Sequence, residues 1–334
     1  MKHVWRVGAR ILTGFFLTAM CAMPQSYTAS AKPGVINYLE GSATLNGQPL
    51  ILNKQQQAPA YLNANETLST SNGKAEILLT PGVFLRIGDN SAVRMISPGL
   101  TDTRVALERG EAMLEVDQIL KDNHIALLDD GATVAVEQTG LYRLTADPQP
   151  VAAVINGKLL VRQDDHKLQL KKGHQTALNS VLKSEKFDRK QEDALYAWSN
   201  VRSEYDAQAT YQAAKKVYVN NYYGGPWGLG FGWSPGWYWD AGFNTWAWLP
   251  YDGAFFNPFG WGFYAPSYVP YVAVRGYGYG WRGTHDYALR GTAGTHITAS
   301  RAGNLHGTAV HVGGSAGGGF HTGIAGGFHG GGHR

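Results

Sequence analysis

Cysteine is almost absent from this chain of 334 residues, whose only thiol is Cys21. Cys21 lies in an N-terminal segment that we expect to be removed, so the rest of the chain offers no disulfide, thiol nucleophile or cysteine metal ligand. Charged residues are sparse too, at 16% of the chain. Without that segment, 26 of the 29 basic residues remain against 25 acidic ones. This near-neutrality gives no electrostatic reason to bind nucleic acid, and we expect no nucleic-acid partner.

Long hydrophobic runs are missing as well. The apolar run at residues 11–23 has about 13 residues, whereas a membrane-spanning helix needs about 20. Three basic residues precede this run, and the small-x-small pattern Ala29-Ser30-Ala31 follows it, which is typical of a cleavable export signal. We predict a signal peptide over residues 1–31, no stable membrane span after its cleavage, and a location in the periplasm or outside the cell. A short uncleaved anchor and lipidation of Cys21 are the less favoured alternatives.

The sequence contains no recognisable catalytic motif of the G-x-S-x-G, H-E-x-x-H or Walker type. Two adjacent carboxylate pairs, Asp129-Asp130 and Asp164-Asp165, could in principle serve acid–base chemistry or calcium binding. Sequence neighbours usually point to opposite sides of a strand or solvate a turn, and we favour that interpretation. We therefore predict no catalytic, cofactor-binding or metal-binding residues, no cofactor, and a protein that is not an enzyme.

Short strands dominate the expected structure of residues 33–180. Apolar and polar residues alternate in several segments, for example residues 75–79 and 92–96, and this period places one strand face on a core and the other in water. Turn dipeptides separate the segments, among them Asn46-Gly47 and Asn72-Gly73. The pattern predicts an all-β roll, sandwich or solenoid.

One long helix is predicted for residues 184–219, which contain neither proline nor glycine. An apolar stripe recurs there at intervals of three or four residues, the period of one helix face. Its members are Leu195, Trp198, Val201, Tyr205 and Ala209. The charges, Arg202 among them, fall mostly on the other positions. The stripe should pack on the β domain or on the segment that follows.

Residues 222–281 form a third region, with eight of the ten tryptophans and frequent glycine and proline. Such density of glycine and proline prevents long regular elements, whereas the aromatic content is unlike plain disorder. We predict an irregular, partly ordered module. Its tryptophans could pack as a small core, which we favour, or offer flat platforms to sugar rings or a partner. The tryptophans in question are Trp237, Trp239, Trp246, Trp248 and Trp261.

The last region, residues 282–334, consists mainly of Gly, Ala, Ser, Thr and His and is predicted to be disordered. Seven of the eleven histidines lie here: His285, His296, His306, His311, His321, His329 and His333. Neutral imidazoles bind zinc, copper or nickel, but these are spaced widely along a glycine-rich chain. We favour a solvated tail over weak metal binding.

The β segment resembles the periplasmic FecR domain of bacterial envelope regulators. Residues 34–43 (GVINYLEGSA) resemble its opening strand–turn–strand, and residues 75–91 (AEILLTPGVFLRIGDNS) its central hairpin. Residues 107–116 (LERGEAMLEV) resemble its l-x-x-G strand, and residues 154–161 with 170–174 its closing hairpin. The resemblance implies a mainly β, FecR-like roll or sandwich over residues 33–180 in an exported protein.

In the signalling form of this family, a cytoplasmic anti-sigma segment precedes a membrane span. Here only about ten residues precede the apolar run, so we expect that a sigma factor is an unlikely partner. We predict instead a non-enzymatic envelope protein that senses or binds through the β domain and engages a protein or a surface polysaccharide. The alternatives are a self-associating surface protein driven by the aromatic-glycine region and, less favoured, a glycan-active enzyme.

Overall fold

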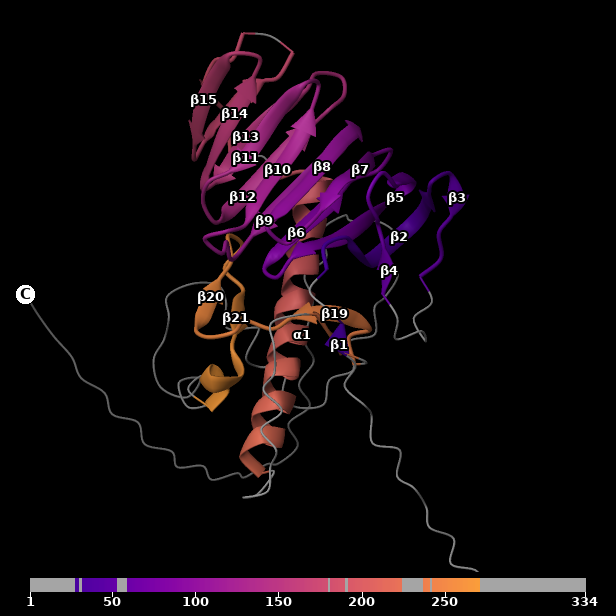
Figure 1. Cartoon of the computed structure of the whole chain (residues 1–334), viewed down its shortest axis with the longest axis vertical. Helices are drawn as coiled ribbons and strands as arrows, with labels where there is room; N and C mark the ends of the chain where they lie inside the picture. The colour runs from indigo at the N-terminus through magenta and orange to yellow at the C-terminus, as the bar shows by residue number, and fades with distance from the viewer. Residues whose placement is uncertain are drawn as a thin grey trace, which may run out of the picture. The chain divides into compact units, whose positions relative to one another are not determined.

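The computed structural model describes residues 28–29, 32–52, 59–179, 181–189, 192–223, 237–240 and 242–270. These residues belong to one compact unit of the chain. Most of the predicted signal peptide and all of the predicted tail at residues 282–334 lie outside the described residues, as do all seven tail histidines. Within the described part the protein is mainly β with one α-helix, which confirms the predicted fold class (Figure 1).

Sixteen strands of the described chain form one sheet. Its first strands are β2 (Val35–Leu45), β3 (Gln48–Pro49), β4 (Ala60–Tyr61), β5 (Thr67–Thr80), β6 (Val83–Ile87), β7 (Ala92–Pro98), β8 (Asp102–Arg109) and β9 (Glu111–Val116). The others are β10 (His124–Asp129), β11 (Ala132–Val136), β12 (Gly140–Thr145), β13 (Val151–Asn156), β14 (Lys158–Gln163), β15 (His166–Lys171), β16 (His174–Ala177) and β17 (Glu185–Lys186). Every pair is antiparallel except β8 with β10.

The sheet curls on itself at β5, its longest strand. The first residues of β5 pair with β7, and its last residues pair with β6. The half β15-β14-β11-β10-β8-β7 and the half β6-β9-β12-β13-β16-β17 therefore leave β5 in different directions. One hydrophobic core joins residues of both halves, for example Val93 and Val134 with Leu85 and Val154. The architecture is the roll or sandwich that the alternating pattern predicts.

The chemistry of the turns explains two of the motifs. Gly110 has φ +77°, and a Cβ at that position would lie 2.2 Å from Ser91 Oγ. The Ser91 hydroxyl accepts a hydrogen bond from the Glu111 backbone amide at 3.0 Å. Ser91 ends the hairpin motif of residues 75–91, and Gly110 and Glu111 belong to the l-x-x-G motif of residues 107–116, so the two motifs meet where β9 begins. The turn predicted at Asn72-Gly73 is wrong, because both residues lie inside β5. Gly73 is needed there for close approach, since a Cβ would lie 2.2 Å from the Glu40 carbonyl oxygen.

The helix α1 spans Ala194–Tyr223, so it begins ten residues later than the sequence pattern suggests. Asp193 sets its start, because its carboxylate accepts a hydrogen bond from the Tyr196 amide at 2.8 Å. Arg143 of β12 pairs with the same carboxylate and fixes this end of the helix to the sheet. No helix among the described residues is long and apolar enough to cross a membrane.

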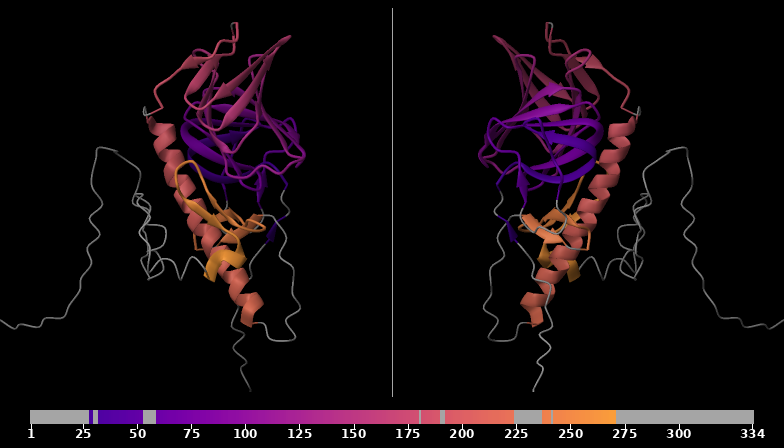
Figure 2. Two further views of the ribbon diagram at one scale, coloured as in Figure 1. Left: turned by 90° about the vertical axis from the view of Figure 1, so that its left-hand side faces the viewer. Right: turned by 90° about the vertical axis from the view of Figure 1, so that its right-hand side faces the viewer.

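The aromatic region forms short strands rather than wholly irregular chain. β18 (Trp237–Asp240) pairs with β19 (Thr245–Trp248) and with β1 (Thr28–Ala29), which lies inside the predicted signal peptide. β20 (Ala254–Phe256) pairs with β21 (Gly262–Tyr264), followed by the 3-10 turn η1 (Pro266–Tyr268). Figure 2 shows α1 running alongside the curled sheet, with these short strands beside it.

Candidate functional site

The side of β5, β6 and β9 that faces α1 carries charged side chains that strand alternation alone would place in water. Glu76, Arg86 and Glu115 are completely buried. Glu76 and Arg86 are direct cross-strand partners, and Glu115 lies on the next strand. The Arg86 guanidinium donates to Glu76 Oε2 at 2.7 Å and also to Glu115. One cation therefore links three neighbouring strands.

The helix supplies the second layer of this network. Arg86 Nη2 lies 3.0 Å from Asp206 Oδ2, and Arg202 Nη2 lies 2.8 Å from Glu76 Oε1. Arg202 and Asp206 are one helical turn apart and also pair with each other at 3.1 Å. Ser203 donates to Glu115 Oε1 at 2.8 Å. The residues from 202 to 206 thus hold α1 on the sheet through charged and polar contacts.

The aromatic region contributes the third layer. The Asn257 amide donates to Glu115 Oε1 at 2.6 Å and also contacts Ser203, while its own oxygen accepts from the Trp261 backbone amide at 2.8 Å. Thr210 of α1 donates to the Trp248 carbonyl at 2.7 Å. The sheet, the helix and both aromatic hairpins therefore meet through buried polar groups.

Burial opposes the charged form of each of these groups, and the neighbours decide which ones stay charged. Burial alone would raise the pKa of Glu76, but the charges of Arg202 and Arg86 lower it well below its ordinary value. Burial alone would lower the pKa of Arg86, yet the surrounding carboxylates raise it, so Arg86 remains a cation. Burial raises the pKa of Asp206 well above its ordinary value, and the charge of Glu76 adds to this.

This cluster, which we call the buried charge network, is suited to fastening and not to acid–base catalysis. Both oxygens of Glu76 accept hydrogen bonds from protein donors, at 2.7 to 2.9 Å. Both oxygens of Glu115 are likewise occupied by Arg86, Ser203 and Asn257. With no exposed surface on either side chain, neither carboxylate is placed to meet a substrate.

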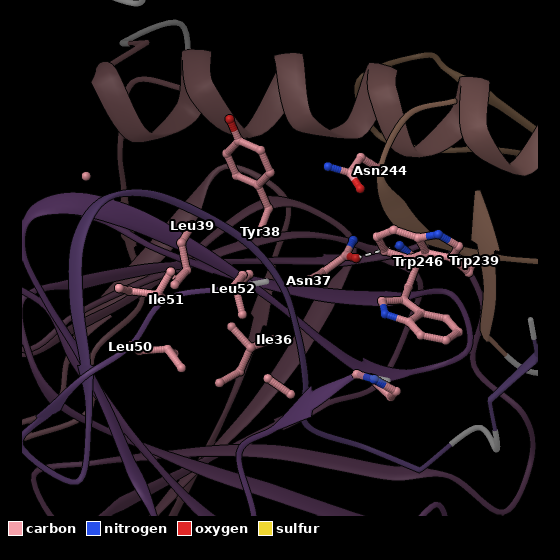
Figure 3. A pocket seen from close by; sticks show the side chains of 13 residues that line it. Ile36, Asn37, Tyr38, Leu39, Leu50, Ile51, Leu52, Trp239, Asn244 and Trp246 are labelled. Atoms are coloured by element: carbon pink, nitrogen blue, oxygen red, sulfur yellow. Dashed lines mark hydrogen bonds between the residues drawn. The ribbon is translucent and has the colours of Figure 1, made fainter. Parts of the chain in front are cut away.

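A cavity of about 440 Å³ lies where β2 meets the β18–β19 hairpin (Figure 3). We call it the hairpin pocket. Trp239 and Trp246 are cross-strand partners with ring centroids 5.5 Å apart, and they form one wall. Ile36, Leu50 and Leu52 lie across from them. The polar lining comes from Asn37 and Asn244, among other groups.

Asn37 connects the hairpin pocket with the buried charge network. Its oxygen accepts a hydrogen bond from the Trp246 backbone amide at 2.8 Å, and its amide donates to Glu76 Oε1 at 2.9 Å. Glu76 Oε1 in turn contacts Arg202 of α1. One side chain on β2 therefore links the hairpin, the sheet and the helix.

The structure assigns most of the sequence-selected tryptophans to a packing role. Trp237, Trp246 and Trp248 are almost fully buried and pack with Phe84 and Phe263. Trp239 and Trp261 are partly buried at the edge of the same cluster. The favoured interpretation of a small aromatic core therefore holds for three of the five tryptophans.

The carboxylate pairs lie apart from this region. Asp130 and Asp164 both have positive φ in tight turns, of 44° and 48°. Asp129 is buried beside Asp130, and burial, together with the charges of Asp130 and Asp147, raises its pKa to about 7. Among the described residues no group of three His, Cys, Asp or Glu side chains could hold a metal ion. The tail histidines lie outside those residues, so metal binding there stays a prediction.

Sequence reasoning missed the buried charge network. Alternation assigned Glu76, Arg86 and Glu115 to a solvated face, and the helix pattern left Arg202 outside the packing stripe. In the structure Val201 is 50% exposed, whereas Arg202 is 6% exposed. A signal was present, because Leu78 and Phe84 lie on the same strand face as these charges. Isolated opposite charges among large apolar residues indicate a covered face.

A comparison with known protein families finds one match. Residues 66–160 match the family model described as FecR protein. The FecR resemblance is therefore confirmed, and this part of the chain is a FecR-like domain. Its predicted extension over residues 33–180 stays a prediction. A comparison with curated proteins finds no match.

Two solved structures from Parabacteroides distasonis, provisionally described as an anti-sigma factor, are also similar. Their sequence identities are 18% and 17%, each with a TM-score of 0.35. The similarity covers 40% of this chain and 64% of each of theirs, which is less than two thirds of their length.

The expectation that a sigma factor is an unlikely partner is contradicted by the FecR match. That expectation was drawn from the few residues that precede the apolar run. Those residues carry no information about what a FecR-like domain regulates.

Proposed function

We propose that this chain is an exported, non-enzymatic envelope protein that senses or binds through its FecR-like domain and regulates a protein partner. The FecR match supports a sensing and regulatory role. The observation that carries the proposal is the position of Asn37, which lines the hairpin pocket and hydrogen-bonds to Glu76 in the buried charge network. An event at the pocket can therefore reach α1 through two hydrogen bonds.

Hydrogen bonds are directional, so a movement of the hairpin changes the geometry of the bonds that connect it to the buried charge network. A displacement of the β18–β19 hairpin strains the Trp246–Asn37 hydrogen bond and, through it, the Asn37–Glu76 bond. Glu76 is shared between Arg86 of the sheet and Arg202 of the helix. Because a buried carboxylate cannot exchange these partners for water, a change at Glu76 alters how α1 is held. A partner that contacts α1 would thereby detect occupancy of the pocket.

The test is a pull-down with the tagged full chain from extracts that contain both envelope and cytoplasmic proteins, followed by mass spectrometry. Sigma factors are among the partners that this experiment must detect. We expect one protein to be recovered specifically, and its recovery to fall with Asn37→Ala. The matched control is Asn200→Ala, which removes the acceptor of the Trp261 indole hydrogen bond outside the network.

Three outcomes would contradict the proposal. One is equal recovery with the two asparagine variants. Another is a complex that contains only further copies of this chain, which would support self-association instead. Release of reducing ends from envelope polysaccharide by the purified protein would show an enzyme. Export is checked separately by N-terminal sequencing, which should begin near Lys32.

A further inference from the structure

The hairpin pocket has the dimensions of a small-molecule site. Its volume of about 440 Å³ falls within the range of about 300 to 1,000 Å³ that is usual for ligand pockets. Two separate parts of the chain build it, namely β2 with the segments that flank residues 53–58, and the β18–β19 hairpin. Figure 3 shows Asn244 and the two tryptophans on one side and the aliphatic residues of β2 and its neighbours on the other.

The lining of the pocket selects against charged ligands. None of the residues that line it in the described chain is Asp, Glu, Lys, Arg or His. The nearest network charges, Glu76 and Arg202, lie behind Asn37 and Tyr38 and are already paired with each other. A charged ligand would lose hydration without gaining a counter-charge, which is costly. The chemistry of the pocket therefore favours a neutral ligand.

The arrangement of apolar and polar groups narrows the ligand further. Trp239 is partly buried and packs at a tilted angle of 59° against the more buried Trp246, so its ring is held in place while part of it stays accessible. Leu50 and Leu52 provide a partly buried aliphatic wall. Asn244 makes no hydrogen bond to any residue in the described ranges, so its amide remains available to a ligand.

A pyranose ring has the matching chemistry. Its C–H face is apolar and packs on the face of an indole, whose π-system attracts the positive C–H edges. Its rim of hydroxyl groups both donates and accepts, as a carboxamide does. An aromatic face, an aliphatic wall and a free amide therefore fit a neutral sugar better than a purely apolar or a charged molecule.

We propose that the hairpin pocket binds a neutral saccharide unit of an envelope polymer, with Trp239 as the stacking face and Asn244 as the hydrogen-bond partner. The inference rests on the proposed function, because an exported protein meets such polymers. It also supplies the stimulus for the sensing path through Asn37. Trp239 and Asn244 are binding residues, whereas Asn37, which is already held by two protein hydrogen bonds, is a positioning residue.

The test is calorimetric titration of the full chain with neutral tetrasaccharides of glucose, mannose, galactose and N-acetylglucosamine, beside a tetrasaccharide of galacturonate. We expect saturable binding of at least one neutral probe and none of the galacturonate. Trp239→Ala should weaken binding by about 3- to 10-fold, the equivalent of one aromatic contact. Asn244→Ala, at a partly exposed turn position, should weaken binding by several-fold.

The matched control is Trp261→Ala, because Trp261 is partly buried but does not line the pocket. The affinity of this variant for the neutral tetrasaccharide should equal that of the unaltered chain. If Trp239→Ala fails to fold by circular dichroism, Asn244→Ala carries the test. No saturable neutral binding, binding of galacturonate only, or equal affinity in the Asn244 variant would each overturn the proposal. The pull-down with the tagged chain separates the two proposals. Specific recovery of a protein partner without saccharide binding would overturn the saccharide proposal and leave the proposed function in place.

Discussion

The strands β5, β6 and β9 have two faces that are buried to the same degree and are chemically opposite. On one face Ile77, Leu85 and Leu114 join the hydrophobic core between the two halves of the sheet. On the other face Glu76, Arg86 and Glu115 lie under α1 and the aromatic hairpins, and all six side chains have no exposed surface. Burial alone therefore does not tell which interactions hold a layer together.

The two faces fasten their neighbours in different ways. Apolar contact is non-directional, so the core face constrains volume and shape more than the position of any one partner. Charged contact is directional, and a buried ion pair contributes little net stability after desolvation while its loss is costly. We infer that the network face sets where α1 lies, and that the core face supplies most of the folding free energy.

The variant Arg86→Met tests the difference between the two faces with the largest expected effect. It removes the cation that contacts Glu76, Glu115 and Asp206. With these carboxylates left without their central partner, the free energy of unfolding should fall by about 3 to 5 kcal/mol. Urea denaturation of the purified chain measures this loss.

The control for that variant is Arg94→Met, which breaks an exposed ion pair with Glu108 at 2.5 Å. An exposed pair is worth about 0 to 1 kcal/mol, so this change should be nearly silent. Equal losses for the two arginine variants would show that the buried network contributes no more than a surface pair.

Leu85→Ala tests the opposite face at the neighbouring position of the same strand. Deleting this fully buried side chain should cost about 2 to 5 kcal/mol, through lost transfer free energy and the remaining cavity. The loss should be the same at low and high salt. A strong dependence of the Leu85→Ala loss on salt would contradict the division of the strands into an apolar and a charged face.

Sequence patterns predicted these strands but not the fate of their second face. Alternation correctly separates Leu85 from Arg86, because it reports which residues share a face. It does not report whether that face is covered, since the cover comes from distant parts of the chain. Asp206 contacts Arg86 across 120 positions, and Asn257 contacts Glu115 across 142. The local pattern therefore does not identify these partners, although the apolar Leu78 and Phe84 on the charged face indicate that the face is covered.

The pocket was only partly predictable for the same reason. The aromatic density of residues 222–281 indicated ordered packing, and Trp239 and Trp246 were named as possible binding platforms. Their meeting with Asn37 and Leu50 depends on β2, about 200 positions earlier in the chain, as the 209-position separation of the Asn37–Trp246 hydrogen bond shows. The turn at Asn72-Gly73 failed because Asn-Gly also suits a close approach inside a strand, here opposite Glu40.

Double-mutant cycles compare two ion pairs that have the same separation but different burial. Arg202–Glu76 is buried and Lys74–Asp89 is partly exposed, yet both pairs lie at 2.8 Å. The cycle with Glu76→Gln and Arg202→Gln should give a coupling energy of about 1 to 3 kcal/mol. The cycle with Lys74→Gln and Asp89→Asn should give about 0.2 to 1 kcal/mol. If the exposed pair couples as strongly as the buried one, the environment is not what distinguishes the network.

An effect that depends on pH is expected at Asp117, which follows β9 and is buried next to Glu115. Burial, followed by the charge of Glu115, raises the pKa of Asp117 well above its ordinary value of 3.8. The folded state therefore binds a proton that the unfolded state has released, and stability is lost as the pH rises from about 3.8 towards the folded pKa.

Asp117→Asn replaces the carboxyl with a neutral group of the same shape, which cannot titrate. The variant and the unaltered chain should have similar stability at pH 3, and the variant should become the more stable one as the pH rises. Urea denaturation at a series of pH values measures this difference, and the titration of groups that do not interact with Asp117 cancels between the two proteins. A difference that stays constant with pH would mean that folding does not raise the pKa of Asp117, so that its carboxylate is ionised in the folded state at neutral pH.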